Sequence, residues 1–137
     1  MFTVKKVADI LNLTEHTIRY YTDCGLVPSV QRDKNNIRLF NEESINWLIG
    51  VKYLKDTGMS IEDIKKYIDL CLEGNSTIEA RYNIILEQKT IAEAQLLEAQ
   101  KRVNYLNAKL SHYLDIVENR VPDDTNPNTW GELKKSI

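Results

Sequence analysis

Cationic and hydroxyl-bearing side chains gather in the first forty residues of the chain, in a pattern suited to binding phosphate groups. Arg19 and Tyr20 are adjacent, and both side chains donate hydrogen bonds to anionic oxygen. Three more cationic side chains follow within a short stretch: Arg32, Lys34 and Arg38. Residues 1–40 carry six Lys and Arg against four Asp and Glu, although the 137-residue chain has a formal net charge of −2. Positive charge is therefore concentrated in the segment that holds these side chains.

Two short helices are predicted to position the first of these side chains. Thr3 and Thr14 are N-cap residues, and each precedes a stretch of helical periodicity. Asn12 tolerates the left-handed conformation that a tight turn between helices needs, and Gly25 ends the second helix. The apolar face of the first helix consists of Val4, Val7, Ala8 and Leu11. The pattern predicts a helix-turn-helix at about 3–23.

A small wing and a second helix pair are predicted to follow. At about 29–40, two short strands flank Asn35-Asn36, which can adopt the positive φ of a hairpin turn. The second helix pair covers 42–72. Its apolar face is expected to comprise Ile45, Leu48, Ile49, Tyr53, Ile61, Ile64, Ile68, Cys71 and Leu72. Residues 1–72 are therefore predicted to form one winged helix-turn-helix domain.

A long helix is predicted over residues 78–118, after a linker at 73–77. This segment has neither Gly nor Pro, and its apolar residues recur with a period of 3.5, which is typical of a coiled coil. Such a helix, roughly 60 Å long, needs a partner helix, and a second copy of the chain is the simplest one. We expect the dimer seam to include Ile85, Ala92, Leu96, Val103, Leu106 and Leu110. Residues 119–137 read as a polar tail.

Several motifs in these segments resemble the MerR family of transcription regulators. They are Thr14-x-x-Thr17-Ile18-Arg19-Tyr20-Tyr21, Gly25-Leu26-Val27-Pro28, the wing residues Arg32 and Ile37-Arg38-Leu39-Phe40, and Leu54-Lys55-x-x-Gly58-x-Ser60-Ile61. The resemblance covers residues 2–72 nearly without gaps, and it extends in kind to the coiled coil. It implies a mainly α fold, with a winged helix-turn-helix domain, a small β-hairpin wing and a long C-terminal dimerisation helix. Asn12 stands where the family usually has Gly, and Asn36 stands where Gly is frequent in the family.

A DNA interface is predicted on the second helix and the wing. A helix fits the major groove, so the early residues Glu15, His16 and Thr17 are expected to face base edges. The resemblance implies that Arg19, Tyr20, Arg32 and Arg38 contact the DNA backbone, and Lys34 adds positive charge to the wing. One tyrosine of the Tyr20-Tyr21 pair is expected to pack in the core. Lys5, Lys6, Lys52 and Lys55 fit phosphate contact and a solvated surface equally well.

The function predicted on this basis is that of a DNA-binding transcriptional regulator. Its two reader helices, related by a two-fold axis, imply a near-palindromic operator in double-stranded promoter DNA. The resemblance further implies that a homodimer distorts promoter DNA and that RNA polymerase is a partner. The alternative is a coiled-coil protein-interaction module whose winged domain does not bind DNA. The acidic balance of residues 41–77, with four Lys and Arg against seven Asp and Glu, favours that alternative.

Cys24 and Cys71 are candidate thiol sensors, although an inert thiol is the preferred interpretation of each. Metal-sensing relatives carry a cysteine where this chain has Glu79-Ala80-Arg81, and thiol-responsive relatives carry one where it has Tyr53. No second His or Cys lies at metal-ligand spacing from His112, so we expect neither metal nor cofactor. Only 19 residues follow Glu118, too few to enclose a drug-sized ligand, and the sequence names no effector.

Other classes of function are excluded on composition and motif content. No nucleophile–base pair or phosphate-cradling glycine loop is present, so the chain is not expected to be an enzyme. No apolar run approaches the ~20 residues that span a membrane, and the N-terminus lacks the pattern of a signal peptide. A cytoplasmic location with reduced thiols is therefore expected.

Overall fold

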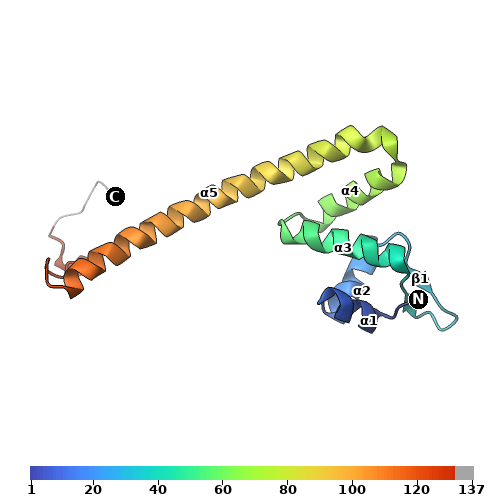
Figure 1. Cartoon of the computed structure of the whole chain (residues 1–137), viewed down its shortest axis with the longest axis horizontal. Coiled ribbons are helices and arrows are strands. Elements are labelled where there is room, and N and C mark those ends of the chain that lie inside the picture. The colour runs from blue at the N-terminus through green and yellow to red at the C-terminus, as the bar shows by residue number, and fades with distance from the viewer. Residues whose placement is uncertain (132–137) are drawn as a thin grey trace. The chain divides into compact units, whose positions relative to one another are not determined.

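The computed structural model describes residues 1–131 and shows a mainly helical chain with one small hairpin (Figure 1). Two compact units are present, Met1–Glu93 and Ala94–Ile137. The predicted fold class is confirmed in its mainly α character, its winged helix-turn-helix order and its long C-terminal helix. The elements are α1 (Val4–Leu11), α2 (Glu15–Asp23), β1 (Gln31–Arg32), β2 (Arg38–Leu39), α3 (Glu42–Asp56), α4 (Ile61–Glu73), the 3-10 turn η1 (Asn75–Thr77), α5 (Ile78–Val117) and the 3-10 turn η2 (Pro127–Thr129).

Helices α1 and α2 begin and join as the sequence predicts. The Thr3 hydroxyl accepts a hydrogen bond from the Lys6 amide at 3.2 Å, and the Thr14 hydroxyl accepts one from the Thr17 amide at 3.0 Å. Asn12 closes α1 in the left-handed conformation, with φ 54° and ψ 46°. These caps satisfy amides that have no partner within the helix, so the start of each helix is set by its local sequence.

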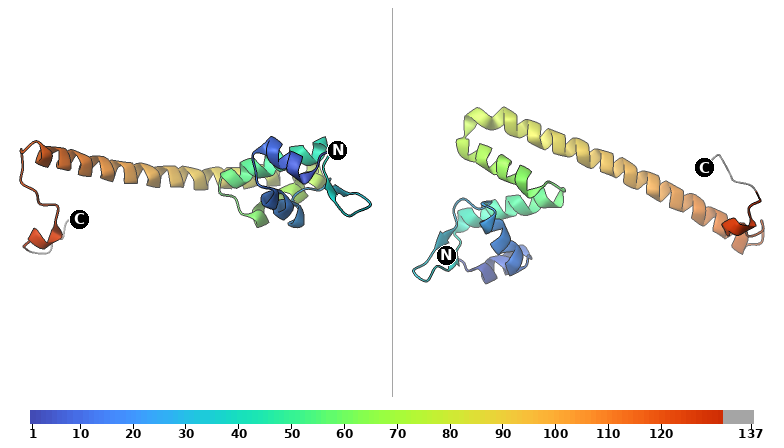
Figure 2. Two further views of the ribbon diagram at one scale, coloured as in Figure 1. Left: turned by 90° about the horizontal axis from the view of Figure 1, so that it is seen from below. Right: turned by 180° about the vertical axis from the view of Figure 1, so that it is seen from behind.

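The wing is an antiparallel hairpin in which Gln31 pairs with Leu39 and Arg32 pairs with Arg38. At its turn, the Asp33 carboxylate accepts hydrogen bonds from the Asn35 and Ile37 amides at 2.8 and 3.0 Å. Of the two turn asparagines, only Asn36 takes a positive φ (63°) among the described residues. The hairpin projects from the first unit in both views of Figure 2.

The N-terminus also joins the wing, which the sequence did not predict. The Phe2 amide donates to the Phe40 carbonyl at 2.6 Å, and the Phe40 amide donates to the Phe2 carbonyl at 2.8 Å. This antiparallel bridge follows β2 directly. Because Phe40 is fully buried, the bridge ties the start of the chain and the base of the wing to the core.

The core lies between α1, α2, α3 and α4. Its buried apolar residues are Val4, Val7, Ala8, Leu11, Ile18, Tyr21, Leu26, Val27, Phe40, Leu48, Val51, Met59, Ile64 and Ile68. The predicted apolar face of α3 was wrong in part, because the helix buries Ser44, Leu48 and Val51, while the Tyr53 residue is 67% exposed. Burial of Ser44 is tolerated because its hydroxyl donates to the Asn41 carboxamide oxygen at 2.9 Å.

The predicted face of α4 was also too wide. The helix buries Ile64 and Ile68, whereas Cys71 is half-buried and Leu72 is 57% exposed. Periodicity marked the correct side of the helix, but the side chains of its last turn are only half-buried or exposed. The exposed end of the predicted stripe is therefore the end nearest to Gly74, the C-cap residue.

Helix α5 is continuous from Ile78 to Val117, and none of its residues is buried within the described part of the chain. In the first unit, Ile84 packs against the core, and the Gln88 amide group donates to the Thr57 carbonyl at 3.1 Å. In the second unit, α5 ends where Asn119 adopts φ 60° and the Arg120 amide donates to the Asp115 carbonyl at 2.9 Å. This is the pattern of a left-handed C-terminal cap.

Part of the predicted polar tail is ordered against the end of α5. The His112 imidazole contacts the Asp124 carboxylate, and the Trp130 indole N–H donates to the Asp124 carbonyl at 2.7 Å. Residues 132–137 of the predicted tail lie outside the described residues. None of the helices within residues 1–131 is both long and apolar enough to cross a membrane.

Candidate nucleic-acid interface

The first turn of α2 presents the side chains that were predicted to face bases. Glu15 and His16 are exposed, and Thr17 is half-buried. The Thr14 hydroxyl donates to the Thr17 hydroxyl oxygen at 2.8 Å, so Thr17 is oriented by the helix cap. Because Thr17 acts as the acceptor in this contact, its own hydroxyl proton remains available to a ligand.

Arg19 lies one turn further along α2 and is held by a weak surface pair. Its Nη2 is 3.2 Å from the Glu15 Oε1, and both side chains are about half exposed, at 48% and 46%. Exposed i, i+4 pairs of this kind contribute little to stability. Arg19 can therefore exchange the Glu15 carboxylate for a phosphate at small cost.

The two adjacent tyrosines have different environments, as predicted. Tyr21 is buried in the core, whereas Tyr20 is 48% exposed. A side-chain hydrogen bond with Cys24 raises the pKa of the Tyr20 phenol. A phenol is protonated at neutral pH with or without this shift, so Tyr20 is able to donate to an anionic oxygen. Burial is the main cause that raises the pKa of Tyr21.

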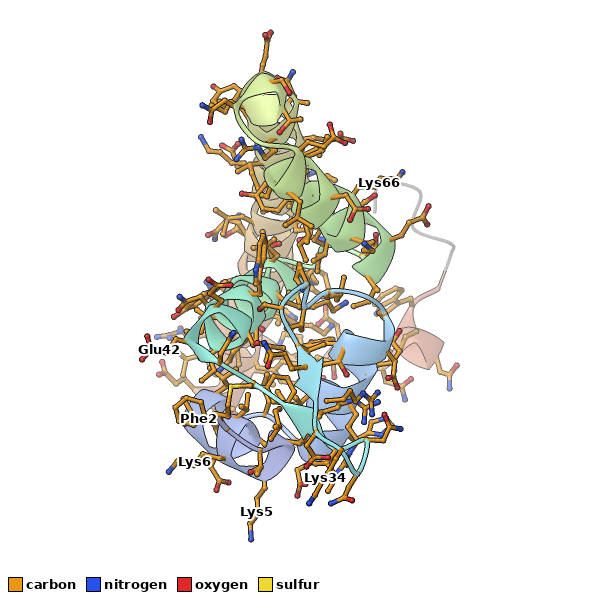
Figure 3. The ribbon with its side chains drawn as sticks, turned by 90° about the vertical axis from the view of Figure 1, so that its right-hand side faces the viewer. Phe2, Lys5, Lys6, Lys34, Glu42 and Lys66 are labelled. Carbon is orange, nitrogen blue, oxygen red and sulfur yellow. The ribbon has the colours of Figure 1, made fainter. Side chains whose placement is uncertain are left out.

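The wing carries the other predicted cations in three different environments. Arg32 is exposed and donates from Nη1 to the Asn36 carbonyl at 2.9 Å, across the turn. The Arg38 side chain is only 17% exposed, and its Nη2 lies 2.5 Å from the Asp23 Oδ1. Lys34 is exposed at the turn, at the same end of the first unit as Lys5 and Lys6 (Figure 3).

All three predicted arginines line one hollow of about 370 Å³. It is lined by Arg19, Arg32 and Arg38, with Thr3, Val4, Lys5, Glu15, Asn36 and Ile37. The hollow thus brings together the start of α1, the first turns of α2 and the wing. Lys5 also lines the hollow, whereas the sequence left its role undecided between phosphate contact and a solvated surface. The sequence feature that could have indicated this role is the position of Lys5 at the capped start of α1. The lining holds four cationic side chains and one carboxylate, so the hollow carries a positive charge that suits an anion.

Other predicted residues lie apart from this hollow. Lys34 and Tyr20 do not line it, and neither do His16 and Thr17. The Lys52 ammonium donates to the Leu11 carbonyl at 2.6 Å, which caps the end of α1. That contact gives Lys52 a structural role at the end of α1.

Comparison with known proteins places this arrangement in a family. The model of the MerR HTH family of regulatory proteins matches residues 2–71. The chain belongs to the MerR family. An uncharacterised HTH-type transcriptional regulator of Haemophilus influenzae is 33% identical over 112 residues, which are 82% of this chain and 83% of that protein. The HTH-type transcriptional regulator AdhR of Bacillus subtilis is 40% identical over 86 residues, which are 63% of this chain and 61% of that protein.

A solved structure of a MerR family member is similar over most of this chain. It is HiNmlR, a regulator that lacks the sensor domain and was crystallised bound to promoter DNA. Its sequence identity with this MerR protein is 32%, the TM-score is 0.72, and the match covers 85% of this chain and 93% of that one. The family consists of transcription regulators and not of enzymes, which agrees with the prediction made from the motifs.

The two thiols of this MerR protein are separate and unpaired with each other. Cys24 and Cys71 are both free and half-buried. Cys24 lies beside Tyr20, and Cys71 lies beside Tyr67, whose pKa is raised mainly by burial. Within residues 1–131 no group of three or more His, Cys, Asp and Glu side chains is arranged to hold a metal ion.

Proposed function

We propose that this chain regulates transcription as a homodimer bound to double-stranded promoter DNA. In each protomer, α2 enters the major groove with Glu15, His16 and Thr17 towards base edges. Arg19, Tyr20, Arg32, Lys34 and Arg38 contact the backbone. Lys5 is added to that set.

The observation that carries this proposal is the convergence of cations beside the reader helix. Lys5, Arg19, Arg32 and Arg38 come from three separate segments, yet all of them line one hollow with Glu15 as the only carboxylate. The hollow thus carries a local positive charge on a chain whose net charge is −2. The hollow borders the exposed face of α2, so a backbone phosphate seated there would leave the helix free to enter the groove.

The dimer is supported by the exposure of the predicted seam. In the single chain, Leu96, Leu106 and Leu110 are 70%, 56% and 67% exposed. Ile85 and Val103 are 40% and 48% exposed, and Ala92 is also exposed. A helix that leaves a regular apolar stripe in water gains free energy when a second helix covers it. A second copy of α5 supplies a matching stripe.

A two-fold dimer has one consequence for the operator, and membership of the MerR family implies two further steps. The operator is near-palindromic, because two identical reader helices contact two half-sites. The protein acts by distorting the promoter, with a deformation energy of a few kcal/mol, and RNA polymerase then reads the altered DNA. We take these last two steps from membership of the MerR family.

Titration of labelled DNA tests the proposal. Fluorescence anisotropy is measured with a duplex from the promoter of the chain's own gene and with an unrelated duplex of equal length, at several salt concentrations. We expect tighter binding to the promoter duplex and a steep loss of affinity with salt. Arg19→Ala should weaken binding to both duplexes and reduce the salt slope of the dimer by about 2, because each protomer loses one phosphate contact. Asn46→Ala, on the exposed side of α3, is the matched control.

The opposite result favours the alternative function. If no salt-dependent binding occurs even at low salt, the winged domain does not bind DNA. The chain is then a coiled-coil interaction module, and α5 binds a helix of another protein. Normal binding by Arg19→Ala would remove Arg19 from the interface while leaving the regulator intact.

A further inference from the structure

An ion pair joins the last residue of the reader helix to the wing. Asp23 is the final residue of α2, and its Oδ1 lies 2.5 Å from the Nη2 of Arg38 in β2. The two residues are fifteen positions apart in the chain. The pair therefore links two elements that both belong to the proposed DNA interface.

The environment of this pair differs from that of the other pair in the interface. Arg19 and Glu15 share one helix, and both are about half exposed, so either side chain can leave the other. The Arg38 side chain is only 17% exposed, while Asp23 remains 61% exposed. An arginine that is confined in this way has few rotamers available, and the carboxylate selects among them.

The hydrogen-bonding capacity of Arg38 is incompletely used. Its Nε–H is shielded from solvent and has no hydrogen-bond partner among the residues that the structure describes. Asp23 engages Nη2, and the guanidinium also lines the cationic hollow. A planar guanidinium fixed at one nitrogen keeps its remaining donors in a defined direction.

We propose that Asp23 is a positioning residue for DNA binding, which holds Arg38 ready to contact a backbone phosphate. This inference rests on the proposed function. Asp23 itself does not contact DNA. It restricts Arg38 before binding, so that less side-chain freedom is lost when the phosphate arrives. It also fixes the wing against the end of α2, so that the two parts of the interface keep one spacing.

Positioning by Asp23 and long-range electrostatics predict opposite effects of Asp23→Asn on DNA affinity. Asp23 is a negative charge close to a surface that binds a polyanion. Long-range electrostatics alone therefore predicts that Asp23→Asn binds DNA more tightly. Positioning predicts that the same substitution binds DNA more weakly, because Arg38 loses its orientation.

The experiment compares variants by anisotropy at one fixed salt concentration on the promoter duplex. We expect Asp23→Asn to lower affinity about three- to tenfold, while Asp23→Glu, which keeps the carboxylate, recovers part of the loss. Asp9→Asn is the matched control, because it removes one exposed charge from α1 and should bind as tightly as the parent or slightly more tightly. In an Arg38→Ala background, Asp23→Asn should cause no additional loss.

The affinities of Asp23→Asn and of the parent chain decide whether Asp23 positions Arg38. Equal or tighter binding by Asp23→Asn overturns the proposal, because Asp23 would then only mask the charge of Arg38. A parent chain that binds no DNA overturns the proposed function and the role of Asp23 with it. Circular dichroism verifies folding of every variant. If Asp23→Asn is unfolded, Arg38→Lys decides instead, since it keeps the charge and removes the fork: affinity equal to the parent would overturn the proposal.

Discussion

The imidazole Nε2 of His112 lies 2.5 Å from the Oδ1 of Asp124, across a separation of twelve residues. The backbone carbonyl of the same aspartate accepts the indole N–H of Trp130. The His112–Asp124 contact thus joins the segment after α5 to the helix, as does the contact of the Arg120 Nε with the Asp115 Oδ1.

Removal of the imidazole should release this segment. In a Trp47→Phe background, Trp130 is the only tryptophan of the chain. We expect His112→Ala to increase quenching of Trp130 fluorescence by acrylamide, because the contact with Asp124 is lost. Ser111→Ala, at the neighbouring exposed position, is the control and should leave quenching unchanged. Identical quenching in both variants would show that His112 does not hold the segment.

Acid should loosen the turn at Asp123. Hydrogen bonds from the Thr125 hydroxyl and amide lower the pKa of the Asp123 carboxyl. The folded turn thus favours the charged form, so its stabilisation is present above the ordinary Asp pKa of about 3.9 and is lost as pH falls below it. Carbon-13 NMR of the carboxyl should show titration below the ordinary pKa. In Thr125→Ala the pKa should move back towards it, and an unchanged value would contradict this account.

In the turn between α1 and α2, alanine at position 12 should destabilise the protein more than glycine does. Asn12 has φ 54° and ψ 46°, a conformation that glycine adopts freely and that alanine adopts with strain. We expect Asn12→Ala to lower the free energy of unfolding by about 1 kcal/mol, measured with urea. Asn12→Gly should remain within about 0.5 kcal/mol of the parent. Equal values for the two variants would mean that the turn rearranges.

The α5 seam should control both oligomeric state and DNA affinity. Leu106→Asp places a charge in the predicted seam and should shift the chain to a monomer in sedimentation equilibrium, with a loss of promoter affinity of at least about tenfold. Leu97→Asp is the matched control, because Leu97 is an equally exposed leucine (58% against 56%) that lies outside the seam. If both variants remain dimeric, the seam is elsewhere.

Local sequence rules were sufficient for the ends of the helices and for the family. The caps at Thr3, Thr14 and Asn12 form with neighbours within four residues. Their roles can therefore be predicted without the tertiary structure. The same is true of the motif around Arg19 and Tyr20, whose spacing follows from one helix.

Those local rules could not predict contacts between segments that are distant in the sequence. Nothing in the sequence pairs Asp23 with Arg38, or the Lys52 ammonium with the Leu11 carbonyl, because each contact depends on how α1, α2, β2 and α3 pack. The apolar face of α3 was misjudged for a related reason. The Ser44 hydroxyl is bonded to Asn41 and to Ser29, fifteen residues away, so this serine occupies a buried position that a hydropathy pattern assigns to an apolar residue.

The pairing of Phe2 with Phe40 has a practical consequence for work on this protein. The bridge fixes the start of the chain at the base of the wing, and the next residues, Thr3, Val4 and Lys5, line the cationic hollow. Any affinity tag fused ahead of Met1 will emerge beside that hollow. An acidic tag at this end would compete with the phosphate for the cations of the hollow, and a polyhistidine tag would add groups that bind phosphate themselves, so binding studies require an untagged N-terminus.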